Sequence, residues 1–298
     1  MLVLPAYAKL NLGLAVLARR DDGWHDIDSI VVSIDWHDLV GLNVRSSSEP
    51  GVALRVTGVA ASGVPSGGEN IAERAARALI DAAARPLTVT VWLDKRVATA
   101  AGLGGGSADA AAVLRAGTLL LQSQGIAFDS ARLAGAAAEL GSDVPALSSR
   151  DVKRVTRRGD VVSSMTAVRL HVVVAVGGTS STAATYAAVA PDEMSDSARI
   201  DKLHAEIAGG MRPSDSLMGS ALEPAAVRAN PALGDSFMRI RRAEPGHQWH
   251  MTGSGGALFA LTGDAREAIE AAQRLRSAGF SALACASFGS TAEAPAVP

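Results

Sequence analysis

Residues 102–107, Gly-Leu-Gly-Gly-Gly-Ser, are the part of this 298-residue sequence whose composition most directly suggests chemistry. Four glycines in five positions allow several backbone N–H groups to converge on one anion, because no Cβ atoms stand in the way. An alanine-rich stretch that favours helix follows, and the start of a helix adds partial positive charge and unpaired donors. A phosphate chain is the ligand that this combination suits best. The alternative is a tight strand-to-helix connection in which Ser107 is an ordinary N-cap.

The common phosphate-binding and nucleophile motifs do not describe this segment. A P-loop ends in Gly-Lys-Ser or Gly-Lys-Thr, and the sequence contains no Gly-Lys dipeptide. The dinucleotide-binding fingerprint needs Gly or Ala at its sixth position, where this run has Ser107 and a second glycine cluster, residues 252–256, has Leu258. The hydrolase Gly-x-Ser-x-Gly spacing and the protein-kinase catalytic-loop motif are missing as well. The remaining interpretation is a phosphate loop of another kind.

Residue patterns also indicate the elements that must position such a loop. Residues 3–16 alternate as in a strand, with Lys9 and Asn11 on its polar face. The sequence predicts further strands at 27–40 (one or two), 52–56, 86–94, 170–176, 257–261 and 282–286. It predicts helices at 69–85, from Ser107 onward, at 128–140, at 199–207, and after Asp264, where Glu267 completes a capping box.

Because strands and helices mix throughout, the sequence predicts the α+β or the α/β class. A boundary near residue 150 is expected to divide a domain at 1–150, which carries the glycine loop, from a second domain at 151–288. Residues 289–298 are predicted to form a disordered tail.

Composition narrows the classes of function. The formal net charge is −2, which gives no electrostatic reason to expect a nucleic acid or an anionic membrane as partner. No apolar run reaches the roughly 18 residues of a spanning helix, and the order of apolar and basic residues at the N-terminus is wrong for a signal peptide. One cysteine, Cys285, excludes an internal disulfide framework and a multi-cysteine metal site. A cytoplasmic protein, monomeric or weakly dimeric, is the simplest expectation.

Five segments together carry a resemblance to a known family. They are residues 5–12 (Pro-Ala-Tyr-Ala-Lys-Leu-Asn-Leu), 19–25 (Arg-Arg-Asp-Asp-Gly-Trp-His), 102–107, 141–145 (Gly-Ser-Asp-Val-Pro) and 252–255 (Thr-Gly-Ser-Gly). In this order they resemble the GHMP kinase superfamily over nearly the whole chain. The Asp-Gly-aromatic-His element resembles the cytidine-recognition motif of the members that phosphorylate a cytidine-diphosphate-linked methylerythritol in non-mevalonate isoprenoid synthesis.

The resemblance implies a two-domain architecture, with an N-terminal α/β domain of the ribosomal-protein-S5-like type and a C-terminal ferredoxin-like α+β domain. It implies ATP as co-substrate with Mg²⁺, for which Ser107 is a possible ligand and Asp109 lies nearby. Asp143 is implied as the catalytic base and Lys9 as the amine beside it. The residues implied to bind ATP are Asn70, Lys95, Ala98, Thr99, Ala100, Ala101, Gly102, Leu103, Gly104, Gly105, Gly106, Ser107 and Ala108.

Other positions are implied to bind the acceptor, a small molecule. Trp24 stands where the family usually has Tyr and keeps a face for stacking on cytosine, while His25 can hydrogen-bond a pyrimidine edge. Tyr186 matches the second aromatic residue of that site. The remaining residues implied to contact the substrate are Asn11, Thr182, Gly253 and Ser254.

Several positions depart from the family pattern. Ala98 and Ala100 replace a usual Pro and Gly before the glycine loop, and Arg157 stands in a turn that normally has a further glycine. The segment 146–160 also lacks the usual Gly pair. Two alternatives therefore remain open: a kinase of this superfamily that acts on another small alcohol, and a nucleotide-binding homologue with weak catalysis.

Overall fold

The computed structural model describes residues 1–65 and 67–289, and the chain forms two units. Unit 1 consists of Met1–Lys9 and Trp36–Ser149, and unit 2 consists of Leu10–Asp35 and the chain from Arg150 onward. The sequence-based division placed residues 10–35 in the first domain, whereas the structure groups them with the second half. The reason is that two long strands, β1 (Leu2–Arg19) and β2 (His25–Ser46), contribute to both units.

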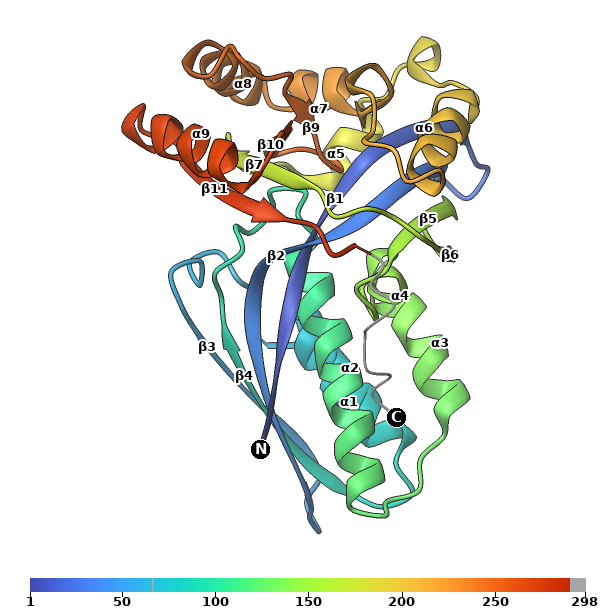
Figure 1. The fold of residues 1–298 in the computed structure, drawn as a ribbon. Helices are drawn as coiled ribbons and strands as arrows, with labels where there is room; N and C mark the ends of the chain where they lie inside the picture. The colour runs from blue at the N-terminus through green and yellow to red at the C-terminus, as the bar shows by residue number, and fades with distance from the viewer. Residues whose placement is uncertain (66, 290–298) are drawn as a thin grey trace. The chain divides into compact units, whose positions relative to one another are not determined.

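Unit 1 packs helices against a sheet (Figure 1). Strand β4 (Leu87–Asp94) pairs antiparallel with residues 39–46 of β2 and parallel with β3 (Gly51–Thr57). The helical elements of the unit are η1 (Gly67–Glu69), α1 (Ile71–Ala82), α2 (Gly105–Ser123), α3 (Ser130–Leu140) and the short α4 (Asp143–Ala146).

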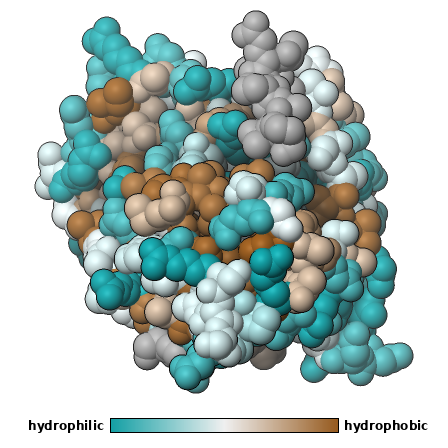
Figure 2. Space-filling view, turned by 90° about the horizontal axis from the view of Figure 1, so that it is seen from below, coloured by the Kyte–Doolittle hydropathy of each residue, from teal (hydrophilic) through white to brown (hydrophobic). Residues whose placement is uncertain are grey.

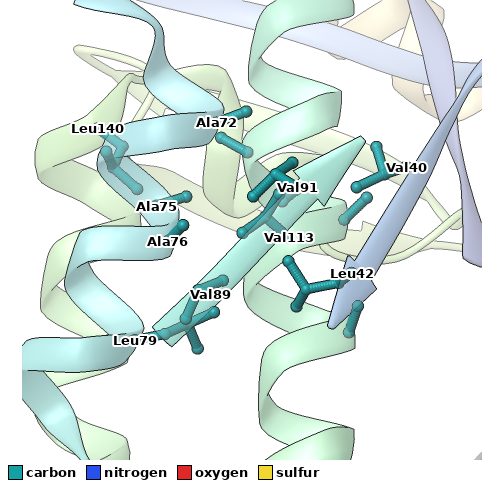
Figure 3. Packing of buried hydrophobic residues seen from close by; sticks show 14 of the residues in the cluster. Val40, Leu42, Ala72, Ala75, Ala76, Leu79, Val89, Val91, Val113 and Leu140 are labelled. Carbon is teal, nitrogen blue, oxygen red and sulfur yellow. The ribbon is translucent and has the colours of Figure 1, made fainter. Parts of the chain in front are cut away.

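The core of unit 1 consists of the inward-facing alternate apolar residues of its strands and of alanines and other apolar residues on one side of its helices. Figure 3 shows Leu79 of α1 beside Val89 of β4, with Val91 further along that strand and Leu42 of β2 on the neighbouring strand. All four side chains are completely buried, so this apolar surface is removed from water, the main favourable term in folding. Small alanines on α1 let the helix approach the sheet closely. This packing fixes the C-terminal end of β4 and the N-terminus of α2, and the glycine loop connects the two.

Unit 2 combines a hairpin with a separate antiparallel sheet. Strand β5 (Val152–Arg157) pairs with residues 27–31 of β2 and with β6 (Val161–Met165), while β8 (Gly219–Ser220) runs parallel to β1 at Gly13. The second sheet has the order β11-β7-β10-β9, from Ser281–Ala286, His171–Val176, Ala257–Thr262 and His250–Met251. The helical elements are α5 (Thr182–Ala187), η2 (Pro191–Glu193), α6 (Ala198–Ala208), η3 (Asp215–Leu217), α7 (Glu223–Ala229), α8 (Pro231–Ala243) and α9 (Ala265–Ser277).

Most predicted elements are present with shifted ends, and some elements of the structure were not predicted. Residues 27–40 lie in one strand, β2, and α2 begins at Gly105 rather than at Ser107. The β5–β6 hairpin and helices α5, α7 and α8 were not predicted. The segments of β5, β6, α5 and α7 are too short to show a sustained period. Helix α8 does carry apolar residues at helical spacing, Leu233, Phe237 and Ile240, and was overlooked. Of the predicted tail at 289–298, residues 290–298 lie outside the described residues.

The surface carries both apolar and hydrophilic side chains. Figure 2 shows apolar residues toward the middle of the face it presents, with hydrophilic residues around them. Single exposed apolar side chains are ordinary in soluble proteins. Trp24 is unusual, since this large aromatic is 53% exposed at a turn. Within residues 1–65 and 67–289, no helix combines the length and apolar character needed to cross a membrane.

Candidate active site

The glycine loop ends in a helix start whose backbone is open to an anion. Gly104 is the N-cap of α2 with φ +68°, and Gly102 is also left-handed at φ +75°. Both conformations are easy for glycine and strained for other residues. Because Gly104 caps the helix, Ser107 is its third residue, and the alternative in which Ser107 is the N-cap is wrong. The first N–H groups of α2 therefore come from glycines, as a phosphate loop needs.

Ala100 occupies the same loop in a left-handed conformation, with φ +53°. The family pattern has glycine there, and the structure gives the reason, since a Cβ atom makes this conformation unfavourable. Arg157 is the second position where this chain lacks a glycine of the family pattern, and its backbone is also left-handed, with φ +61°. The chain thus keeps the backbone shape at both positions without the residue that best tolerates it.

Replacing Ala100 by Gly is expected to increase the free energy of unfolding by about 1 kcal/mol, because strain is relieved at a left-handed residue. The matched change Ala134→Gly, on the exposed side of α3, is expected to decrease it by about 1 kcal/mol through lost helix propensity. Urea denaturation of both variants measures the difference. Equal destabilisation by the two changes would contradict a strained Ala100.

Lys9 and Asp143 come together next to this loop, within unit 1. Lys9 lies in β1 and is 4% exposed, and its Nζ is 3.6 Å from Oδ2 of Asp143, the first residue of α4. The backbone N–H of Lys9 donates to the carbonyl oxygen of Leu103 at 2.9 Å. A Cβ atom on Gly104 would lie 2.8 Å from Cγ of Lys9. The amine therefore lies against the loop itself, with a carboxylate beside it that is 37% exposed.

Asn70 and Lys95, both expected near the nucleotide, have other partners here. The Asn70 side chain caps α1 by accepting a hydrogen bond from the N–H of Ala72 at 2.9 Å, and donates one to the carbonyl oxygen of Pro65. Lys95 is 2% exposed and its ammonium donates to the carboxylates of Asp38 and Asp109. Contact of either side chain with ATP stays a prediction.

Asp109, in the second turn of α2, carries an unusual carboxylate. Its Oδ2 is 2.6 Å from Nζ of Lys95, whereas its buried Oδ1 has no hydrogen-bond partner. Burial raises the pKa of Asp109 to about 7, although the nearby ammonium of Lys95 acts in the opposite direction. A buried oxygen without a partner is rare in folded proteins and marks a position where the surroundings matter.

The predicted cytidine residues lie in unit 2. The rings of His25 and Tyr186 are 5.3 Å apart and tilted by 32°, while the guanidinium of Arg158 lies 5.5 Å from the centre of the Trp24 ring. A carboxylate oxygen of Asp22 accepts a hydrogen bond from the backbone N–H of Trp24, which fixes the turn before Trp24. Burial, followed by the charge of Arg19, lowers the pKa of His25, so its ring is neutral at pH 7 and offers one donor and one acceptor.

The second glycine cluster and its neighbours form one hydrogen-bonded group in the same unit. The hydroxyls of Thr182 and Ser254 are 2.8 Å apart, and Ser220 donates to the carbonyl oxygen of Gly253. Asn11 donates its backbone N–H to the Thr252 hydroxyl at 2.8 Å and its side-chain amide to Ser29 at 2.7 Å. The structure thus gathers Asn11, Thr182, Gly253 and Ser254 around one turn.

The oxygen atoms near the loop suit magnesium, which prefers oxygen ligands and keeps several waters. They are the hydroxyl of Ser107 on the first turn of α2, the unpartnered Oδ1 of Asp109 and the partly exposed carboxylate of Asp143. Among the described residues, no group of three or more His, Cys, Asp or Glu side chains could hold a metal ion by itself. A bound magnesium ion would therefore depend on the ligands of a nucleotide as well.

Sequence reasoning missed Asp38 and Arg158. Asp38 is completely buried in β2, next to the residues that pair with β4, the strand that leads to the loop. There was little signal for it in the sequence, because Asp38 is one of four aspartates in β2 and no local pattern marks it as an acid that is buried and needs a positive partner. Arg158 belongs to a basic cluster with Lys153, Arg154 and Arg157, whose composition alone indicates no contact with Trp24. Its position over Trp24 depends on the unpredicted hairpin.

Family models match both parts of the chain. The model described as GHMP kinases N terminal domain matches residues 70–150, and the model described as GHMP kinases C terminal matches residues 196–282. Together the matches cover more than half of the sequence and include the glycine loop, Lys95 and Asp143.

Similar proteins with a curated name agree with these models. A 4-diphosphocytidyl-2-C-methyl-D-erythritol kinase of Xanthobacter autotrophicus is 34% identical, over 91% of this chain and 92% of its own length. The protein of the same name from Rhizorhabdus wittichii is 37% identical, over 87% of this chain and 84% of its own length.

Solved structures show the same architecture. A crystal structure of 4-(cytidine 5'-diphospho)-2C-methyl-D-erythritol kinase aligns with a TM-score of 0.78 and 31% identity, covering 97% of this chain and 100% of that one. The mevalonate kinase of L. major aligns with a TM-score of 0.65 at 15% identity, over 98% of this chain and 97% of its own, which shows a shared fold alone.

Proposed function

The chain belongs to the 4-diphosphocytidyl-2-C-methyl-D-erythritol kinases, within the GHMP kinases, and we propose that it uses ATP to phosphorylate the 2-hydroxyl of 4-diphosphocytidyl-2-C-methyl-D-erythritol. The reaction serves non-mevalonate isoprenoid synthesis, and we place it in the cytoplasm, carried out by a monomer or weak homodimer. The observation that carries the proposal is the Lys9–Asp143 pair lying against a glycine loop that opens a helix.

In this proposal the loop binds the triphosphate of ATP. The N–H groups at the start of α2 donate to phosphate oxygens, and the partial positive charge of the helix start favours their negative charge. Phosphoryl transfer is catalysed mostly by positioning and by stabilising charge. Magnesium, when bound through a residue such as Ser107, would supply further positive charge to the phosphate oxygens.

Lys9 and Asp143 act on the acceptor hydroxyl. Asp143 accepts the hydroxyl proton as the new O–P bond forms, and its partly exposed position leaves one side of the carboxylate open to a substrate. The ammonium of Lys9 stabilises the carboxylate and the negative charge that develops on the transferred group. The bond between phosphorus and the β-phosphate oxygen of ATP breaks, and ADP leaves with that oxygen.

Trp24, His25 and Tyr186 are proposed to recognise the cytosine of the acceptor. Aromatic faces stack on a base, and the neutral imidazole of His25 can both donate to and accept from a pyrimidine edge. Asn11, Thr182, Gly253 and Ser254 are proposed to contact the rest of the acceptor. These roles rest on the family motif and on the ring contacts within unit 2.

An ATP-consumption assay with purified protein tests the function. Turnover is expected with 4-diphosphocytidyl-2-C-methyl-D-erythritol and not with mevalonate or homoserine as acceptor. A preference for either of the other alcohols would replace the proposed acceptor while keeping a GHMP kinase. Binding of ATP without turnover of any acceptor would favour the weakly catalytic homologue.

Replacing Trp24 by Ala is expected to raise the KM for the cytidine acceptor at least about tenfold, because stacking on a base contributes about 1–3 kcal/mol. The KM for ATP is expected to stay within about twofold. The control is Met238→Ala on α8, which removes another half-exposed apolar side chain of unit 2. Steady-state kinetics with each substrate varied in turn measures both KM values. Equal changes in the KM for the acceptor and the KM for ATP would argue against stacking.

A further inference from the structure

Asp38, Lys95 and Asp109 form a cluster, here called the buried ion cluster, that the proposed chemistry does not use. The three residues are 0%, 2% and 3% exposed, and the Lys95 ammonium bonds both carboxylates. Burying three charges is unfavourable unless they are paired and hydrogen-bonded, and a cluster of this kind contributes little to stability compared with apolar residues. Its position in the fold suggests another purpose.

The buried ion cluster joins the two ends of the glycine loop. At the entrance, Oδ1 of Asp38 accepts the backbone N–H groups of Arg96 and Val97, the residues that lead into the loop. At the exit, Asp109 lies in the helix that follows the loop and bonds Lys95 through Oδ2 at 2.6 Å. Lys95 therefore links Asp38 to Asp109 and is the positive charge that lies between the two carboxylates.

The ammonium also lies close beneath the start of α2. A Cβ atom on Gly105 would be 3.5 Å from Nζ of Lys95 and 3.3 Å from Cγ1 of Val97. The first turn of the helix thus packs on Lys95 and Val97. Loss of the ammonium would leave two buried carboxylates facing each other without a counter-charge.

We propose that Lys95 is a positioning residue that sets the affinity of the glycine loop for ATP by holding Asp38 and Asp109 together, without touching the nucleotide. The inference rests on the proposed function, in which this loop binds the triphosphate. Two of the three N–H groups of the ammonium already serve the cluster, and the side chain is too deeply buried to reach a phosphate. An ATP site built from backbone N–H groups depends on their spacing, which the cluster fixes at both ends.

The test compares Lys95→Met with Lys153→Met. Lys153 is the matched control, since it is also a buried lysine, 3% exposed, but lies in unit 2. Binding of a non-hydrolysable ATP analogue is measured by calorimetry, and backbone exchange of residues 98–108 by hydrogen–deuterium exchange. Lys95→Met is expected to weaken binding at least about tenfold and to speed exchange in the loop, because it breaks a buried ion pair. Lys153→Met is expected to change affinity by less than about twofold, a margin well under 1 kcal/mol.

Three results would overturn the proposal. Unchanged affinity in Lys95→Met would show that the loop does not need the cluster. An equal loss in Lys153→Met would indicate general destabilisation. Weaker binding with unchanged loop exchange would mean that Lys95 contacts the nucleotide directly, since a contact residue need not alter the free loop.

A second pair of variants keeps the test informative if Lys95→Met does not fold. Asp109→Asn retains an oxygen that can accept from Lys95, whereas Asp109→Leu does not. The first is expected to keep ATP affinity within about threefold and the second to lose it as Lys95→Met does. If Asp109 acted only as a magnesium ligand, both variants would weaken binding and shift its magnesium dependence together, which would contradict the proposal.

These measurements need no acceptor, so they fail separately from the proposed function. Wild-type protein that binds the ATP analogue but does not phosphorylate the cytidine acceptor would contradict the function and leave the role of Lys95 intact. Wild-type protein that does not bind the analogue would contradict both.

Discussion

Replacing Asp143 by Asn is expected to lower kcat at least about a hundredfold, because proton transfer by a positioned base contributes about 10²–10⁴-fold. Asn keeps the shape of the side chain and cannot accept the hydroxyl proton. The binding of ATP is expected to change less than about threefold, since the glycine loop supplies the contacts to phosphate. Stability is also expected to change little, because Asp143 is 37% exposed and its ion pair with Lys9 spans 3.6 Å.

The matched control is Asp81→Asn, the same chemical change at an exposed position of α1. Rapid-quench and steady-state measurements of the wild type and both variants separate the chemical step from binding. Near-normal turnover of the Asp143 variant would rule out the carboxylate as base. A drop in kcat that the control shares would indicate a general effect of lost negative charge in unit 1.

Replacing Gly104 by Ala is expected to lower kcat about a hundredfold, for a reason different from loss of a reacting group. Gly104 has φ +68°, and an added Cβ would lie 2.8 Å from Cγ and 3.1 Å from Cε of Lys9. The side chain of Lys9 must move, and a displacement of about 1 Å at a reacting group can cost about 10²-fold in rate. The left-handed backbone adds about 1–2 kcal/mol of strain, so stability is expected to fall as well.

Gly135→Ala provides the matched comparison in the same unit. No heavy atom lies within 4 Å of an added Cβ at Gly135, which sits on α3, so this change is expected to raise stability by about 0.5–1 kcal/mol and leave kcat unchanged. Kinetics and denaturant unfolding of the two variants measure both effects. An active Gly104→Ala enzyme would show that the loop can shift without disturbing Lys9.

The sequence predicted the parts of the site that local patterns describe. Alternation around Lys9 predicted its strand, and the glycine run predicted an anion-binding helix start. The meeting of Lys9 with Asp143 followed from family resemblance alone, because no local pattern relates residues so far apart in the chain. The structure places the two side chains together, while their catalytic roles stay predictions.

Features set by long-range packing escaped prediction. The buried partners of Lys95 come from β2 and α2, and only the folded sheet brings Asp38 under the loop. The positive φ angles at Ala100 and Arg157 could not be predicted either, since Ala and Arg favour negative φ. Resemblance marked both positions as missing a glycine, but only the backbone showed why glycine is usual.

The division of the chain has a consequence for its synthesis on the ribosome. Residues 10–35 emerge early, but their strand partners in unit 2, such as Arg157 for Ile27 and Gly219 for Gly13, are translated much later. β1 and β2 can pair with each other early, but at about 5–20 residues per second they wait for many seconds before these later partners are made. Nascent chains stalled before residue 150 should therefore need chaperone protection at β1 and β2, whereas those stalled after residue 289 should not.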